Sequence, residues 1–122
     1  MSRSAGESGD ISAFLPLHAF TFHILLSLTS GDRHGYGIIQ DVEHRTDGTV
    51  RLSAGALYRT IARLLEQGLI AESARRSTSA GDPRRRYYRL TAFGRAVTQA
   101  ETNRLARLVR LARSSGLVPE TP

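Results

Sequence analysis

Apolar side chains recur every three to four residues in four segments of the chain, a period typical of helices that pack on one face. Pro16 suits the first turn of the first segment, and Gly31 lies just beyond its end. Ser53 is the predicted N-cap of the third segment, and Gly68 ends it. The helices are therefore expected over 16–29, 36–45, 53–67 and from Thr91 to about 114.

The third predicted helix has two unlike faces. Its inward face is expected to hold Ala54, Leu57, Ile61, Leu64 and Leu65. Its outward face holds Gly55, Arg59, Ala62, Arg63 and Glu66, with Tyr58 at the border. An ordinary solvated surface is one explanation. The small residues of the first turn, followed by two arginines, favour the other explanation, a face shaped to approach another molecule closely.

Residues 69–75 and 85–91 alternate in the manner of strands, and the Ser/Gly/Asp/Pro-rich segment between them predicts a hairpin. Tyr88 is expected to fill the core beneath the hairpin, with Tyr87 more exposed. Residues 49–53 are expected to be an extended link or a single short strand. Stacking of Tyr87 on single-stranded nucleic acid is the less favoured alternative for that side chain.

The order helix, helix, helix, hairpin, long helix predicts a mainly α fold with a small β-hairpin. This is the arrangement of a winged helix-turn-helix, here followed by a long C-terminal dimerisation helix. The expected domains are a disordered tail at 1–12, a winged helix-turn-helix DNA-binding domain at 13–91, the dimerisation helix at 92–114 and a flexible tail at 115–122.

Charge narrows the choice of partner. The chain has 17 basic residues against 11 acidic ones, a net charge of +6 and a pI near 11.0. Every basic residue is arginine, the side chain best suited to bidentate contact with phosphate and guanine. Six of them lie within residues 75–89, opposed only by Asp82. An arginine-dense wing beside a duplex would contact phosphates, so we expect double-stranded DNA as the partner.

Other classes of function find little support. There is no cysteine for a disulfide or a thiolate metal site, and the four histidines lack metal-ligand spacing. We find no nucleophile paired with a base and no phosphate-binding glycine loop, so neither an enzyme nor a cofactor is expected. The sequence shows no membrane-spanning run and no signal-peptide pattern, which predicts a cytoplasmic protein without membrane contact.

The last helix has an apolar stripe too long for a three-helix domain to cover. The stripe could pack back on the first helix of the same chain, but we favour a dimer interface that also includes the first helix. The predicted dimerisation residues are Leu17, Phe20, Phe93, Val97, Ala100, Leu105, Leu108 and Leu111. Three arginines of this helix, Arg104, Arg107 and Arg110, are expected to stay solvated.

Three segments together resemble the N-terminal domain of the PadR family of bacterial transcriptional regulators. They are "HGYGIIQDV" at 34–42, "LSAGALYRTIARLLEQGLI" at 52–70 and "DPRRRYYRLTAFGR" at 82–95. The resemblance spans about residues 15–95 and is closest to the short subfamily that lacks a large C-terminal domain. Arg59 stands where many members have proline, so its role rests on the helical wheel alone.

The resemblance implies a homodimeric repressor that binds a pseudo-palindromic operator and is often released by a small effector. Without a dedicated effector domain, such an effector would use the dimer interface or the core. The predicted DNA-binding residues are Tyr36, Gly37, Ser53, Ala54, Gly55, Tyr58, Arg59, Arg63, Arg84, Arg85 and Arg86. The alternatives are a winged-helix module for protein contacts and a ligand sensor without an operator of its own.

Overall fold

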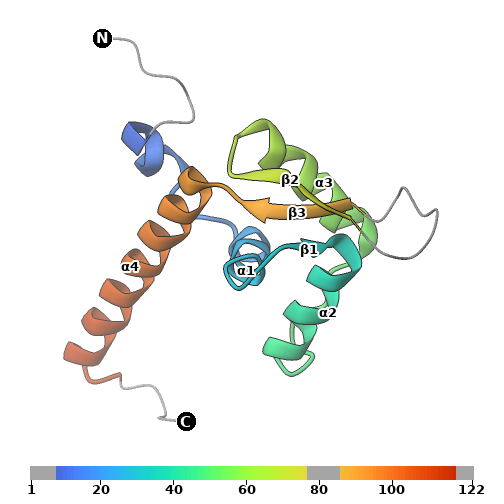
Figure 1. Cartoon of the computed structure of the whole chain (residues 1–122). Coiled ribbons are helices and arrows are strands. Elements are labelled where there is room, and N and C mark those ends of the chain that lie inside the picture. The colour runs from blue at the N-terminus through green and yellow to red at the C-terminus, as the bar shows by residue number, and fades with distance from the viewer. Residues whose placement is uncertain (1–7, 77–85, 118–122) are drawn as a thin grey trace.

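The computed structural model describes residues 8–76 and 86–117 of the chain. Figure 1 shows helices gathered around a small sheet, with the last helix extending away from them. The elements are the 3₁₀ helix η1 (Ser8–Phe14), α1 (Ala19–Ser27), β1 (Arg33–His34), α2 (Gly35–Arg45), α3 (Ala54–Glu66), β2 (Ile70–Arg76), β3 (Arg86–Leu90) and α4 (Ala92–Ser114).

The core lies where α2 packs against both α1 and α3, and where the sheet and the start of α4 close over these helices. Burial of each aliphatic side chain contributes about 1.5–3 kcal/mol, so this cluster holds the helices together. The fully buried side chains of the cluster include Ile24, Leu25, Ile38, Leu57, Leu64, Leu69 and Val97.

The recognition-helix segment folds as expected. The Ser53 hydroxyl accepts a hydrogen bond from the backbone N–H of Ala56 at 3.1 Å and caps α3. Gly68 has a φ of +75°, in the left-handed region that favours glycine just after a helix. The inward face was predicted too broadly, however: Leu65 is 39% exposed, and Ala54 is also exposed. Both lie too far from the Leu57 direction for α2 to cover them.

The sheet has one strand more than the predicted hairpin, in the order β1-β3-β2. The third strand is Arg33–His34, which pairs antiparallel with Tyr88 and Tyr87 of β3. The link at 49–53 forms no strand. Two residues are too short for a readable alternation, so only the pairing with β3 reveals β1.

The N-terminal segment departs from the prediction. The tail predicted at 1–12 becomes 3₁₀ helix from Ser8, because Ile11 and Phe14 pack on the core and the Phe14 ring meets the Phe93 ring edge-on at 5.6 Å. The first α-helix was predicted from 16 but begins at Ala19. His18 decides this boundary, since its Nδ1 accepts the N–H of Phe20 at 3.1 Å.

The helix α4 has a packed half and a projecting half. Its buried residues are Gly94, Val97, Thr98 and Glu101, and the elements beneath them are η1 and α1. Beyond Glu101 no residue of the described helix is buried, and Figure 1 shows this half running away from the rest of the molecule. Both sequence interpretations therefore hold in part: the first half packs on its own chain, and the second half has no cover within one chain.

Candidate nucleic-acid interface

The outward face of α3 is fully accessible. Gly55, Arg59, Ala62, Arg63 and Glu66 are all exposed, as the helical wheel predicted. Arg59 and Arg63 form no ion pair with any described residue. A Cβ atom at Gly55 would meet only Arg59 Nη1, at 3.5 Å, so the backbone there is open to close approach.

A groove of about 210 Å³ runs between the start of α1 and the arginine side of α3. Its lining residues are His18, Phe20, Thr21, Ala56, Arg59, Thr60 and Arg63. Two guanidinium groups beside a hollow of this size give the flank of α3 a positive surface for phosphate.

The start of α2 lies against the other flank of α3. A Cβ atom at Gly35 would lie 2.6 Å from Cζ of Tyr58, so the absence of a side chain at Gly35 lets the Tyr58 ring pack over the helix start. Tyr58 remains 45% exposed, and Tyr36 in the first turn of α2 is 58% exposed. His34 caps this helix by accepting the N–H of Gly37 at 2.9 Å. The two tyrosines thus stand on adjoining parts of one surface.

The described part of the wing joins this surface through β3. The His34 ring meets the Tyr87 ring edge-on at 5.2 Å, and Tyr88 is only 7% exposed, which confirms its predicted core position. Burial raises the pKa of Tyr88 above its ordinary value. Arg86 is exposed and pairs with Glu72 of β2 at 3.4 Å. The other predicted wing residues, Arg84 and Arg85, lie outside the described residues.

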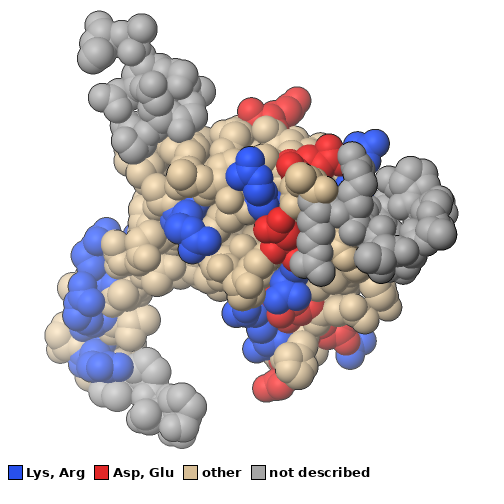
Figure 2. Space-filling model, viewed as in Figure 1, with Lys and Arg blue, Asp and Glu red and all other residues tan. Residues whose placement is uncertain are grey.

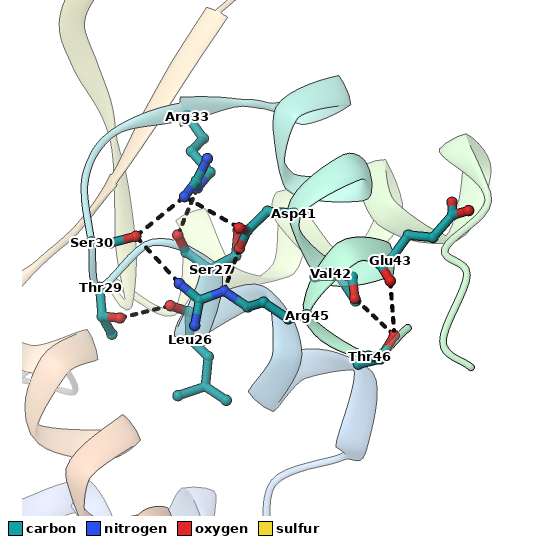
Figure 3. A network of polar contacts seen from close by, with 10 residues as sticks. All are labelled: Leu26, Ser27, Thr29, Ser30, Arg33, Asp41, Val42, Glu43, Arg45 and Thr46. Carbon is teal, nitrogen blue, oxygen red and sulfur yellow. Dashed lines mark hydrogen bonds and ion pairs between the residues drawn. The ribbon is translucent and has the colours of Figure 1, made fainter. Parts of the chain in front are cut away.

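A polar network fixes the third strand to α2 and to the end of α1 (Figure 3). The Asp41 carboxylate accepts from Arg45 Nε at 2.8 Å and pairs with Arg33 Nη2 at 3.3 Å. Arg33 also donates through Nε to the backbone carbonyl of Ser27 at 2.9 Å and to the Ser30 hydroxyl at 3.2 Å. Because Arg33 belongs to the strand that pairs with β3, these bonds tie the wing to the helices.

The two signs of charge occupy different parts of the face shown in Figure 2. Blue side chains follow the projecting end of α4, and red ones gather over the opposite side of the molecule. The exposed arginines of that projecting end are Arg107, Arg110 and Arg113. A duplex therefore meets a chain whose basic groups are distributed by element rather than evenly.

The predicted dimerisation residues divide between the core and the surface. Val97 is 0% exposed inside one chain, so its assignment to an interface was wrong: the wheel identifies a buried face and cannot say which partner buries it. Phe20 is 40%, Leu108 48% and Leu111 63% exposed. The partly buried members are Leu17, Phe93, Ala100 and Leu105.

Arg104 was expected to be solvated and is not. Its Nε and Nη2 donate to the two oxygens of Glu101 at 2.8 and 2.7 Å, and 28% of its side chain is exposed. The physical reason is the buried carboxylate of Glu101, whose charge needs a partner.

A family model described as the transcriptional regulator PadR-like family matches residues 24–100, well over half of the 122 residues. The chain belongs to this family. The matched range contains α2, α3, the sheet and the packed half of α4, so the predicted PadR resemblance and the winged-helix fold are confirmed.

Individual relatives agree with this assignment. An uncharacterised protein of Lysinibacillus sphaericus is 34% identical over 73 residues, which cover 60% of this chain and 65% of that relative. The chain thus spans less than two thirds of that relative's length. A transcriptional regulator from Clostridium thermocellum is 25% identical with a TM-score of 0.64, over 88% of this chain and 95% of that one.

A structure of Bacillus subtilis PadR in complex with operator DNA has a TM-score of 0.58 to this chain. The two are 20% identical over 72% of this chain and 47% of the other, so this likeness shows the fold alone.

Three structural contributors were missed from the sequence. Gly35 stood in a quoted motif, and a glycine directly before a helix was a readable signal for close approach. Asp41 and Arg45 have i,i+4 spacing, and Glu101 and Arg104 have i,i+3 spacing, which sequence alone could have paired. Arg33 could not have been found, because its partners come together only in the fold.

Two surveys of the described residues complete the site. None of the described helices combines the length and the apolar character that crossing a membrane would require. Within the same residues, no group of three His, Cys, Asp or Glu side chains is placed to hold a metal ion.

Proposed function

We propose that this PadR-like protein is a sequence-specific double-stranded DNA-binding regulator that acts as a homodimeric repressor. The observation that carries the proposal is the outward face of α3. It combines an open backbone at Gly55 with two arginines that no described carboxylate neutralises. A B-DNA major groove admits a helix, and arginine reads guanine there through two hydrogen bonds.

The surrounding elements suit the same docking. Tyr36, Gly37 and Tyr58 at one flank, and the groove beside Arg63 at the other, would face the phosphate backbones beside that major groove. Ser53, Ala54 and Gly55 form the first turn, where free backbone N–H groups favour phosphate. The wing, with Arg84, Arg85 and Arg86, would contact the neighbouring backbone.

Dimerisation through α4 would place two recognition helices about one helical turn apart on a pseudo-palindromic operator. The projecting half of α4 supports this, because it presents a hollow of about 410 Å³ lined by Arg104, Arg107, Leu108, Arg110 and Leu111. A small effector that released the repressor would bind where α1 and α4 of two chains meet. The experiment that tests the proposal is selection of duplexes from a random pool by the purified protein, followed by footprinting. Recovery of a two-fold symmetric site supports it, and no enrichment refutes it.

The wing should contribute affinity without sequence preference. Arg86→Ala is expected to weaken binding to operator and random duplex by the same factor, because a phosphate contact is independent of sequence. The slope of log K against log salt should fall by roughly one unit. Titrations at several salt concentrations measure both quantities. A loss confined to the operator would show that Arg86 reads bases instead.

The exposed leucines of α4 should hold the dimer. Leu111→Glu places a charge on the apolar stripe, and we expect about a tenfold or larger rise in the dimer dissociation constant. Sedimentation equilibrium measures this constant. The matched control is Ala106→Glu, which adds the same charge on an exposed position of the opposite face of α4. Equal effects of the two variants would contradict an interface on the leucine face.

A further inference from the structure

Glu101 marks the point where α4 leaves the body of the molecule. It is 2% exposed, and every described residue of the helix beyond it is at least partly accessible. A buried carboxylate at such a point is unusual, because removing a charge from water costs several kcal/mol unless the charge is paired and hydrogen-bonded.

The carboxylate of Glu101 is fully engaged on two sides. Arg104, one turn along α4, donates from Nε and Nη2 to its two oxygens at 2.8 and 2.7 Å. The backbone N–H of Leu17 donates to the same carboxylate. The hydrogen bonds from Arg104, before all other influences, lower the pKa of Glu101, so the group stays charged at neutral pH. We name Leu17, Glu101 and Arg104 the Glu101 clasp.

The clasp joins two parts of the chain that do different work. Leu17 belongs to the short segment that leads from η1 into α1, and α1 packs against α2 in the DNA-binding body. Arg104 opens the projecting half of α4. Leu17, Glu101 and Arg104 all lie outside residues 24–100 that the family model matches, so that match assigns them no role.

The kind of bond matters for the angle of α4. Apolar contacts such as Val97 in the core are not directional, so by themselves they allow a helix to rock. A bidentate guanidinium–carboxylate pair and a backbone hydrogen bond are directional and restrict such movement. The clasp therefore fixes the direction in which α4 leaves the body.

A small error in that direction would have a large effect at the DNA. From Glu101 to Ser114 the helix is about 13 residues long, which at about 1.5 Å per residue makes a lever of about 20 Å. A tilt of about 10° moves the end of such a lever by roughly 3.5 Å, close to the rise of one base pair of about 3.4 Å.

We propose that the Glu101 clasp determines half-site spacing: Glu101 is a positioning residue that sets the distance between the two recognition helices of the dimer. The inference rests on the proposed function, because it needs a dimer built on α4 that binds two half-sites. It predicts that loss of the clasp leaves each half-site contact unchanged and widens the range of spacings that the dimer accepts.

The test uses the full chain and the operator selected by it, with spacers lengthened and shortened by one and two base pairs. The wild type should prefer one spacing by about tenfold over its neighbours, and Glu101→Gln should reduce this preference to about threefold or less. Affinity for an isolated half-site should not change. Glutamine keeps an acceptor for the Leu17 N–H and removes the ion pair.

A second variant keeps the test decisive if a buried change at Glu101 lowers stability. In Glu101→Leu/Arg104→Leu, apolar side chains replace the buried pair, an exchange that proteins often tolerate. This variant should also lose the spacing preference. The control is Arg95→Gln, which removes one positive charge from an exposed position of the same helix and should keep the wild-type profile.

The outcomes separate the two proposals. A folded Glu101→Gln or double-leucine variant that retains the wild-type spacing profile overturns the clasp and leaves the proposed function standing. A wild type that shows no preference between operator and random duplex overturns the proposed function, and the clasp falls with it. A broadened profile in both variants, with the control unchanged, supports the clasp.

Discussion

Gly94→Ala should lower the free energy of unfolding by about 3 kcal/mol and the melting temperature by roughly 10 °C or more. A Cβ atom at Gly94 would collide with the carbonyl oxygen of Leu69 and would lie only 2.8 Å from its carbon. Both are backbone atoms, which cannot move aside as the end of a flexible side chain can.

The surroundings of Gly94 leave no alternative position for the carbonyl. The Thr91 backbone N–H donates to Leu69 O at 3.1 Å, and the Thr91 hydroxyl donates to the same oxygen at 3.0 Å and to Gly68 O at 2.7 Å. Thr91 also caps α4 by accepting the N–H of Gly94 at 2.9 Å. Relief of the clash would break this cap or the join between α4 and β2.

Thermal unfolding at one fixed protein concentration measures the effect, because the melting temperature of a dimer depends on concentration. The control is Gly55→Ala, another glycine inside a helix, whose added Cβ would meet only Arg59 Nη1 at 3.5 Å. The better helix propensity of alanine should leave that variant unchanged or slightly more stable. Equal melting temperatures for the two variants would refute the packing argument.

Sequence periodicity was enough to predict most of the fold. The caps at Ser53 and Thr91 and the buried side chain of Tyr88 follow from local rules, and local rules act on neighbouring residues that a sequence displays. For the same reason the exposed face of α3 was predicted residue by residue. The limit was reached at Leu65, since the edge of a buried face depends on where α2 lies and not on the helix itself.

The features that the sequence did not reveal depend on distant residues. β1 exists because Arg33 and His34 reach Tyr88 and Tyr87, more than fifty positions along the chain. Val97 and Arg104 show the same limit on α4, because an apolar or charged residue on a stripe does not state whether its own chain or another covers it. Glu101 could be paired with Arg104 by spacing, but its bond to the Leu17 N–H could not be foreseen.

The outward face of α3 makes the sharpest prediction about recognition. Arg59→Ala should cost about 1–3 kcal/mol of operator affinity and relax specificity at one base position, if the guanidinium reads guanine through two hydrogen bonds. Arg59 is exposed and forms no ion pair with a described residue, so the change should leave the fold intact. Binding to a panel of operators with each base pair substituted in turn measures the effect.

The form of the result distinguishes reading a base from holding a phosphate. If Arg59 reads a base, substitution of that one base pair should cost the wild type as much as the mutation does, and should cost the alanine variant almost nothing. Arg86→Ala, at the wing, should instead keep the full penalty at every base pair. An equal loss for Arg59→Ala on operator and random duplex would assign Arg59 to the phosphate backbone, together with Arg63 in the groove beside α1. Base reading by α3 would then have to come from the small side chains and backbone of its first turn.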